Sequence, residues 1–310
     1  MTALDTSTMP RHTAEVDKTS TLRVLVATAA DADSLGALHV AAGLARERGA
    51  IVMALGVAVP FPHKVTPLFT VKPPVSIDEH SRLELLADIR RRLGSLPGTD
   101  LWAKEAVIGW PSNVINTAAA AWNASLIVLG IGHHGRIDRI FGTETAVAVM
   151  KHARIPVLAV SAKARDLPRQ ACAAVDFTEA SLSSAELAGR LLAADGTLTL
   201  VHTCAFKGIK ARKGDLVDLY RAGAAAKLED AVAEVRRRVG CDVTGVLLDG
   251  EPGDTILKYS TRERCDLVSL GGHEQGLVDR ILLGSVRTRV LRGAKCSVLI
   301  APPSVAGERA

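Results

Sequence analysis

Residues 265–300, CDLVSLGGHEQGLVDRILLGSVRTRVLRGAKCSVLI, decide the fold, because they place a glycine-rich loop and a helical stretch between two short apolar runs. Residues 126–160, LIVLGIGHHGRIDRIFGTETAVAVMKHARIPVLAV, have the same order. Leu126–Gly130 precedes Leu267–Gly271 by 141 residues. Similarity at a fixed interval over long segments is typical of an internal duplication. The sequence therefore predicts two tandem copies of one domain.

Each copy alternates strand-length apolar runs with stretches of helical periodicity, the pattern of βαβ units on a parallel sheet. In the first copy the expected strands are 22–28, 51–59, 101–108, 126–130 and 156–160, and the expected helices are 32–48, 77–93, 112–122 and 139–153. In the second copy the expected strands are 171–175, 197–203, 242–248, 266–271 and 297–301, and the expected helices are 179–194, 215–239, 253–263 and 280–293. The predicted fold class is α/β, with two tandem doubly wound domains that each have a five-stranded parallel sheet and right-handed crossovers.

Length and composition suit this duplication. The chain has 310 residues, 48% of them hydrophobic and 3% aromatic, so we expect a core of Ala, Val, Leu and Ile between helices and parallel strands. We expect a flexible tail over residues 1–20, a first domain over 21–161, a linker over 162–169, a second domain over 170–303 and a tail over 304–310.

Charge and hydropathy argue against several classes of protein. The net charge is +5, from 38 basic and 33 acidic residues, and few aromatic side chains are present to stack on bases, so nucleic acid is not an expected partner. Arg90–Arg92 and Arg236–Arg238 are expected at helix ends, where cations meet the negative end of the helix dipole; a functional basic patch is the less favoured alternative. No apolar run approaches the ~18–20 residues of a membrane span, and the N-terminus lacks the apolar segment of a signal peptide. We therefore expect a cytoplasmic protein without membrane contact.

All five cysteines lie in the second half, and no two of them form a CxxC pair. Cys172, Cys241, Cys265 and Cys296 lie at the starts of expected strands, whereas Cys204 lies at a carboxyl strand end. This placement favours small, buried and inert thiols. A redox cluster is the alternative, and an odd count in a cytoplasmic chain argues against a disulfide framework.

Local signals support the helix boundaries. Thr178 and Ser112 are expected N-caps, and Gly49 is expected just past a helix end. The long helix expected over 215–239 has apolar residues at spacings of mostly three or four, which predicts one core-facing stripe. The members of this stripe are Leu216, Leu219, Ala222, Ala226, Leu228, Val232 and Val235.

Four motifs of the second half occur in a distinctive order. They are VDFTEAS at 175–181, LVHT at 200–203, DGEPGDTI at 249–256 and LGGHEQGLVDRILLGSV at 270–286, followed by the apolar run CSVLIA. This combination resembles the universal stress protein family, and both copies match its order over about residues 21–302. The resemblance implies an adenine-nucleotide α-hydrolase-like sheet with strand order 3-2-1-4-5 in each domain. It also implies an intrachain pseudo-dimer in which the last strands of the two copies pair, and some members form homodimers as well.

The nucleotide-binding members of that family carry the pattern G-x-x-G-x9-G-[S/T] and an Asp after the first strand. The second copy has Asp176, Gly271 at the first glycine and Gly284–Ser285 thirteen residues further on. The resemblance therefore implies an adenine nucleotide, with ATP as the first choice, in the second domain. Asp176 and Thr203 are expected beside the base and ribose, and Gly271, Gly284, Ser285 and Val286 at the phosphates. Val175, Leu270 and His273 complete the expected cofactor-binding residues.

Two departures from the pattern leave an alternative open. Glu274 replaces the second glycine, and its carboxylate repels phosphate by ~1 kcal/mol or more at short range. In the first copy Ala29 lies near the Asp position, and Asp31 could take the role of that Asp only after a loop shift. A one-residue deletion is also needed to align Gly142–Thr143 with the final Gly-Ser pair. The first copy is thus expected to be degenerate for nucleotide. The alternative is a scaffold of the same fold that binds no nucleotide and acts through dimerisation and through contacts to proteins or other small ligands.

Catalytic motifs are not apparent in the sequence. It has no G-x-S-x-G elbow, no Walker lysine motif and no convergent carboxylates, so an enzyme is not expected, although slow hydrolysis of bound ATP stays open. His133 and His134 are adjacent and have no third ligand nearby in the sequence, so no metal is expected either. The expected role is a stress-response module that acts by conformation or by partner binding.

Overall fold

The computed structural model describes residues 21–60, 77–131, 142–205, 214–271 and 285–302, and within them the two halves repeat one order of elements. The strands of the first half are β1 (Arg23–Ala27), β2 (Ile51–Ala58), β3 (Ala103–Ile108), β4 (Leu126–Ile131) and β5 (Val157–Ser161). Its helices are α1 (Leu35–Arg48), α2 (Ile77–Gly94), α3 (Pro111–Ala121) and α4 (Thr143–His152). The strands of the second half are β6 (Gln170–Ala174), β7 (Thr197–Cys204), β8 (Asp242–Asp249), β9 (Leu267–Leu270) and β10 (Ser297–Ile300). Its helices are α5 (Glu179–Leu191), α6 (Gly214–Arg238), α7 (Pro252–Arg262) and α9 (Ser285–Gly293).

The strands join into one continuous sheet with the order β3-β2-β1-β4-β5-β10-β9-β6-β7-β8. Strands pair in parallel within each half, with Val24 opposite Leu126 and Ala171 opposite Leu267. Counted within its own half, each set of strands has the order 3-2-1-4-5, so the predicted fold class and strand order are confirmed. The two halves meet where β5 and β10 pair antiparallel, as the resemblance implied.

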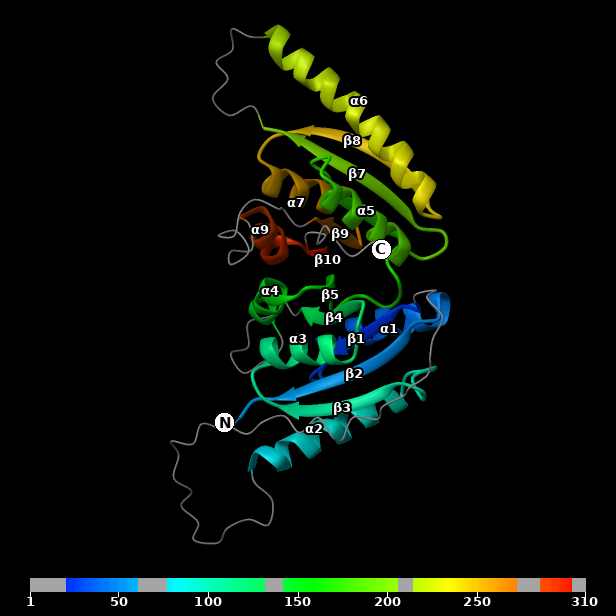
Figure 1. The fold of residues 1–310 in the computed structure, drawn as a ribbon, viewed down its shortest axis with the longest axis vertical. Coiled ribbons are helices and arrows are strands. Elements are labelled where there is room, and N and C mark those ends of the chain that lie inside the picture. The colour runs from blue at the N-terminus through cyan, green and yellow to red at the C-terminus, as the bar shows by residue number, and fades with distance from the viewer. Residues whose placement is uncertain (1–20, 61–76, 132–141, 206–213, 272–284, 303–310) are drawn as a thin grey trace.

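Helices cover both faces of this sheet (Figure 1). The core beneath α1, α2, α5 and α6 includes Leu38, Ile89 and Leu228, and the core on the other face, beneath α3, α4, α7 and α9, includes Ile115 and Val290. Aliphatic side chains dominate both layers, as the composition predicted. Figure 1 shows an elongated molecule with β5 and β10 in the middle and with α2 and α6 at opposite ends.

Polar contacts reinforce the junction between the halves. The Arg292 guanidinium of α9 reaches the Glu144 carboxylate of α4 with Nε–Oε1 and Nη2–Oε2 distances of 3.1 Å. On the side of α1, the Arg48 Nη2 donates to the Leu192 carbonyl oxygen at 2.6 Å. These contacts fix the two halves to each other at both helix layers.

The expected helix ends are mostly confirmed, with one correction. Thr178 caps α5, where its hydroxyl accepts the Ser181 N–H at 3.3 Å, and Gly49 closes α1 in the left-handed region with φ of 64°. The prediction of Ser112 as a cap is wrong, because α3 begins one residue earlier, at Pro111. Proline suits the first helical position, since its φ is already helical and its missing N–H would have no partner there.

The core-facing stripe predicted on the long helix is wrong for the N-terminal half of α6. Leu228 and Val235 are buried, and Val232 packs against the same core. The exposed members are Leu216 (49%), Leu219 (71%), Ala222 and Ala226. In Figure 1 the N-terminal end of α6 lies away from β7 and β8. Ala226 lies between the buried Ala224 and Leu228, so it is exposed because it is on the outer side of the helix. Helical periodicity alone does not reveal how far the sheet extends.

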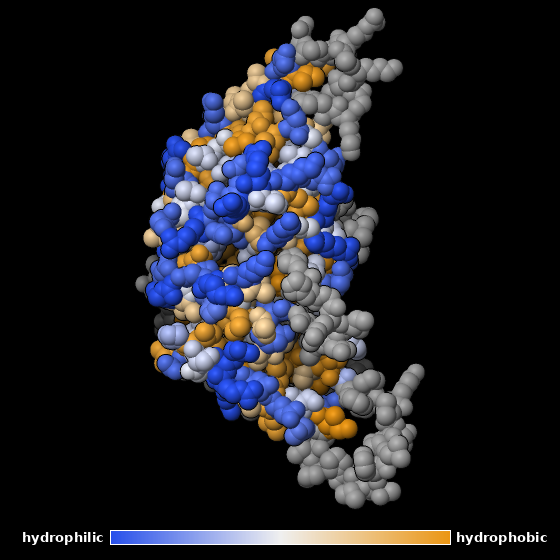
Figure 2. Space-filling view, turned by 180° about the vertical axis from the view of Figure 1, so that it is seen from behind, coloured by the Kyte–Doolittle hydropathy of each residue, from blue (hydrophilic) through white to orange (hydrophobic). Residues whose placement is uncertain are grey.

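Hydrophilic side chains cover most of the face shown in Figure 2, with smaller hydrophobic patches between them. The two arginine clusters lie at the C-terminal ends of α2 and α6, as predicted. They contact the chain itself: Arg92 Nη2 donates to the Ala30 carbonyl oxygen at 3.1 Å, and Arg238 Nη1 lies 2.5 Å from Glu186 Oε1. Within the described ranges, none of the helices combines the length and the apolar character needed to cross a membrane.

Candidate functional site at the carboxyl ends of β6, β7 and β9

The carboxyl ends of three neighbouring strands bring several predicted site residues together. Ala174, at the end of β6, lies opposite both Leu270 of β9 and Val201 of β7. Asp176 therefore emerges between Gly271 on one side and Thr203 on the other. Ligands of open α/β sheets bind at this edge, beside the strands where the connections change direction.

The Asp176 carboxylate is held in a tight turn at the start of α5. Its Oδ1 accepts the Thr178 N–H at 3.1 Å and the Thr178 hydroxyl at 2.5 Å. The Asp176 N–H donates to Ser181 Oγ at 3.3 Å, and Phe177 between them has a φ of 66°, in the left-handed region. This turn orders an exposed carboxylate in front of the first turn of the helix, independently of any ligand.

His202 supports the same turn, and the sequence did not single it out. Its Nδ1 donates to the Val175 carbonyl oxygen at 2.8 Å, and its ring lies against Phe177 with centroids 4.4 Å apart. His202 is 9% exposed, and its Nε2 has no hydrogen-bond partner among the described residues. Because side chains alternate along a strand, His202 and Thr203 face opposite sides of the sheet. In the sequence, the only signal for this role of His202 is that a histidine directly precedes the predicted site residue Thr203.

Gly271 has a packing role that requires no ligand. A Cβ atom at this position would lie 2.6 Å from the Ser181 Cα and 2.7 Å from the Ala180 carbonyl oxygen. Gly130 of the first half is enclosed in the same way, with a Cβ placed 2.6 Å from the Asp33 carbonyl oxygen. Glycine here lets the first helix of each half approach the fourth strand, so it does not by itself indicate phosphate binding.

The other predicted residues are distributed unevenly. Val175 and Leu270 are each 4% exposed and belong to the two core layers, so only their main chain is placed to meet a ligand. Thr203 is half-buried near the end of β7, and Ser285 and Val286 begin α9. The remaining predictions, His273, Gly284 and the departure at Glu274, lie outside the described residues.

The first half carries the same turn with different side chains. Thr28 N–H donates to Leu55 O at 2.9 Å, and Val175 N–H donates to Val201 O at 2.9 Å, which makes Thr28 the counterpart of Val175. Ala29 therefore occupies the position of Asp176, as the sequence predicted. Asp31, two residues further on, accepts hydrogen bonds from the N–H and the hydroxyl of Ser34, in the turn just before α1.

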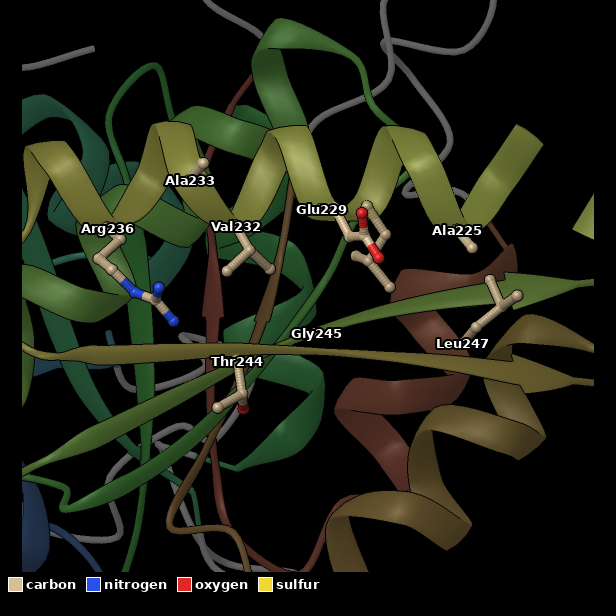
Figure 3. A pocket seen from close by; sticks show the side chains of 9 residues that line it. Ala225, Glu229, Val232, Ala233, Arg236, Thr244, Gly245 and Leu247 are labelled. Carbon is tan, nitrogen blue, oxygen red and sulfur yellow. The ribbon is translucent and has the colours of Figure 1, made fainter. Parts of the chain in front are cut away.

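A second hollow lies apart from this edge. A cavity of about 550 Å³ separates α6 from β8. Leu228 and Val232 lie over Gly245, and the side chains of Glu229 and Arg236 stand along the helix (Figure 3). A Cβ on Gly245 would come within 3.0 Å of both apolar side chains, so glycine sets the depth of this hollow. None of the predicted site residues lines it.

Metal ligation finds no support in the described ranges, where no group of three or more His, Cys, Asp or Glu side chains is placed to hold an ion. His133 and His134 lie outside those ranges.

Comparison with known proteins agrees with the two-copy architecture. The model of the universal stress protein family matches residues 21–161 and again residues 169–302. The chain belongs to the universal stress protein family. The two matched segments make this universal stress protein a tandem member with two domains.

Individual relatives of this universal stress protein are distant. A universal stress protein of Methanocaldococcus jannaschii is 31% identical over 75 residues, which is 23% of this chain and 44% of that protein. The chain thus spans less than half the length of that curated relative. The solved universal stress protein of Archaeoglobus fulgidus is 18% identical and has a TM-score of 0.60, with 91% of this chain and 96% of that chain covered. A solved structure from Pseudomonas aeruginosa, described as a "putative universal stress protein", is 15% identical and has a TM-score of 0.62, with 92% of this chain and 94% of that chain covered. At these identities the solved structures support the fold alone.

Proposed function

We propose that this universal stress protein binds an adenine nucleotide, ATP in the first place, in its second domain. Nucleotide binding there would control its conformation or its partners during a stress response in the cytoplasm. The observation that carries the proposal is the exposed, ordered carboxylate of Asp176 at the strand-end edge, where the first domain has Ala29. An ordered polar group at this edge is what a ligand site of an α/β sheet requires.

The proposed contacts divide between the two ends of the ligand. Asp176 and Thr203 contact the base and ribose, and the main chain near Gly271 lies between them and the phosphates. Gly284, Ser285 and Val286 hold the phosphates, since amide groups at the start of α9 and its helix dipole attract anions. The nucleotide acts as a bound ligand in this proposal, so purified protein should release no phosphate from ATP above the blank.

A scaffold without nucleotide is the second candidate, and two observations favour it. Gly271 is explained by packing against α5 alone, and Glu274 places a carboxylate where the family pattern has a glycine. In that case both domains would serve dimerisation and contacts to proteins or to other small ligands.

Calorimetric titration of the full chain with ATP tests the proposal. Wild type should bind, and Asp176→Ala should weaken binding by about tenfold or more, because it removes a charged hydrogen-bond acceptor. The matched control is Asp31→Ala, which removes a carboxylate from the equivalent loop of the first domain and should leave ATP affinity unchanged. Equal affinity of wild type and Asp176→Ala would sink the proposed contacts, and no binding by wild type would favour the scaffold.

Glu274→Gly separates the two candidates further. If the wild-type site binds ATP despite Glu274, removing the repulsion of ~1 kcal/mol should raise affinity by about fivefold. A change from no detectable binding to clear binding would mean that the native site is closed and that the chain acts as a scaffold.

A further inference from the structure

The sheet ends in two edge strands, β3 in the first domain and β8 in the second, and their side chains differ. An edge strand turns part of its main-chain N–H and C=O groups outward, so it can pair with a strand of another chain unless charges or cover prevent this. Strand β3 carries Lys104 and Glu105 within it, and Arg82 Nη1 of α2 donates to the Ala106 carbonyl oxygen at 3.3 Å. Charged side chains thus protect the first edge.

Strand β8 lacks this protection. Its residues between the two ends, Val243–Leu248, include no charged side chain, no lysine and no proline, which are the residues that commonly block edge pairing. Asp242 and Asp249 lie at the two ends. Each is near an arginine of α6, since Arg236 Nη2 lies 3.9 Å from Asp242 Oδ1 and Arg221 pairs with Asp249. No described strand lies beyond β8, so the second edge is open to pairing.

The hollow between α6 and β8 lies at this open edge. The apolar side chains that line it belong to Ala225, Leu228, Val232, Ala233 and Leu247. In Figure 3 Val232 projects from α6 toward the strand, and Leu247 projects from the strand toward α6. Both are only partly buried within the chain. A further element that covers the hollow would remove more of this apolar surface from water, which favours association.

Two opposite charges line the same hollow. Glu229 and Arg236 are both exposed, and their spacing of seven residues places them on one side of α6, about 10 Å apart along its axis. Glu229 has no hydrogen-bond or ion-pair partner in the described part of the chain. Arg236 keeps donors for a further partner, although its Nη2 already donates to the Val243 carbonyl oxygen. About a two-fold axis near Val232, Glu229 of one copy meets Arg236 of another, and this pair forms twice.

The chain already contains a junction of this kind between its own halves. Strands β5 and β10 pair antiparallel, and α4 and α9 contact each other across that junction (Figure 1). Arg292 in the last turn of α9 reaches Glu144 in the first turn of α4, with 2.9 Å between Nη2 and Oε1. Two copies joined through β8 would repeat this arrangement, with an antiparallel strand pair, two neighbouring helices and glutamate–arginine pairs between them.

We propose that the edge formed by α6 and β8 binds a second copy of this chain. The two β8 strands pair antiparallel about a two-fold axis, the two α6 helices pack side by side over them, and Glu229 and Arg236 pair reciprocally. A two-fold interface uses the same surface on both copies, and the β3 edge is protected, so association stops at a dimer. The proposal does not depend on a nucleotide at the carboxyl ends of β6, β7 and β9.

Sedimentation velocity of the full-length protein over a range of concentrations measures the association. Wild type should form a reversible dimer, and Glu229→Arg should raise the dissociation constant by about tenfold or more, because like charges then meet at two places. Glu229→Arg/Arg236→Glu exchanges the two charges and should restore most of the affinity. The proposal is overturned if wild type stays monomeric at every concentration or if Glu229→Arg dimerises like wild type. A double variant with the wild-type circular dichroism spectrum but the affinity of Glu229→Arg would contradict the reciprocal pairs.

A lysine introduced on each edge strand distinguishes the two ends of the sheet. Thr244→Lys brings two ammonium groups near the two-fold axis and should weaken the dimer by about tenfold or more. The matched control is Ala103→Lys on β3, which should leave the association unchanged. Both positions are exposed, so the fold should tolerate the changes. Equal effects of the two variants would contradict the assignment of the interface to β8.

Hydrogen exchange followed by mass spectrometry locates the interface in the wild-type protein. Peptides that contain residues 244–248 should exchange several-fold more slowly at concentrations where the dimer predominates than where the monomer does, because their outward N–H groups become paired. Peptides that contain residues 103–108 should exchange at one rate under both conditions. Protection of residues 103–108, or of neither strand, would show that the two copies meet elsewhere and would overturn the proposal.

Discussion

The loops after the first strand of the two domains, residues 28–34 and 175–181, follow one backbone path with different side chains. Ala30 and Phe177 both have positive φ, 57° and 66°, and each loop approaches a glycine of the fourth strand so closely that no Cβ fits. The first loop is tied by Arg92, which donates to the Ala30 carbonyl oxygen at 3.1 Å. The second is tied by the stacking of Phe177 on His202.

This comparison separates what the fold requires from what a ligand would require. The positive φ, the glycine and a side-chain oxygen that accepts the N–H three residues further on recur in both loops, so they belong to the architecture. The carboxylate of Asp176 has no counterpart, because Ala29 occupies that place, and α5 already has its cap in Thr178. The candidate site is thus marked by the difference between the loops rather than by the glycine that they share.

The largest expected effect concerns the shared glycines. Gly130→Ala and Gly271→Ala should each lower the free energy of unfolding by about 3 kcal/mol or more, because the new methyl groups would meet backbone atoms at 2.6 Å. Urea unfolding followed by circular dichroism measures the loss. Gly94→Ala is the control: a Cβ there meets nothing within 4 Å, so the change should stay below about 1 kcal/mol. If Gly271→Ala were as mild as Gly94→Ala, the close approach of α5 to β9 would be wrong.

A smaller effect should distinguish the side-chain oxygens of Asp31 and Thr178, which each accept an N–H near the start of the first helix of their domain. Asp31 Oδ1 accepts both the Ser34 N–H at 2.9 Å and the Ser34 hydroxyl at 2.7 Å, whereas Thr178 accepts one N–H at 3.3 Å. Asp31→Ala should therefore cost about 1–2 kcal/mol and Thr178→Ala about 0.5–1 kcal/mol. Urea midpoints of the two variants give the comparison, and Asp31→Asn, which keeps an acceptor, should recover most of the loss. A larger cost for Thr178→Ala would contradict the greater stabilisation assigned to the Asp31 contacts.

The architecture was predictable because it follows from local periodicity and from duplication. Every expected strand has a counterpart, and the pairing of the last strands followed from the resemblance. The support of the Asp176 turn by His202 was not predictable, because it depends on a contact between residues 27 positions apart in the sequence. The exposure of Leu219 likewise depends on which surfaces the folded sheet brings together.

The smallest expected effect concerns how the first helix of each domain is tied. Helix α5 is joined to α6 by Glu186 and Arg238, whereas α1 is joined to the linker by Arg46, whose Nη2 lies 2.8 Å from Asp166 Oδ1. Partial burial raises the pKa of Asp166, but the Leu167 N–H and Arg46 outweigh it and hold that pKa below the ordinary value. A carboxyl group with a depressed pKa in the folded state stabilises the fold above its unfolded pKa of ~3.9, and this contribution is lost as the pH falls through the folded pKa.

Wild type should therefore be more stable than Asp166→Asn near neutral pH, and the difference should close between about pH 5 and pH 2. The difference itself should stay below about 1 kcal/mol, because both partners are more than half exposed and water screens the pair. Urea midpoints measured at several pH values for the two proteins provide the test. A stability difference that stays constant down to pH 2 would mean that Asp166 acts through its hydrogen bond to the linker main chain rather than through its charge. In that case neither α1 nor α5 would be held by a titrating group of this linker.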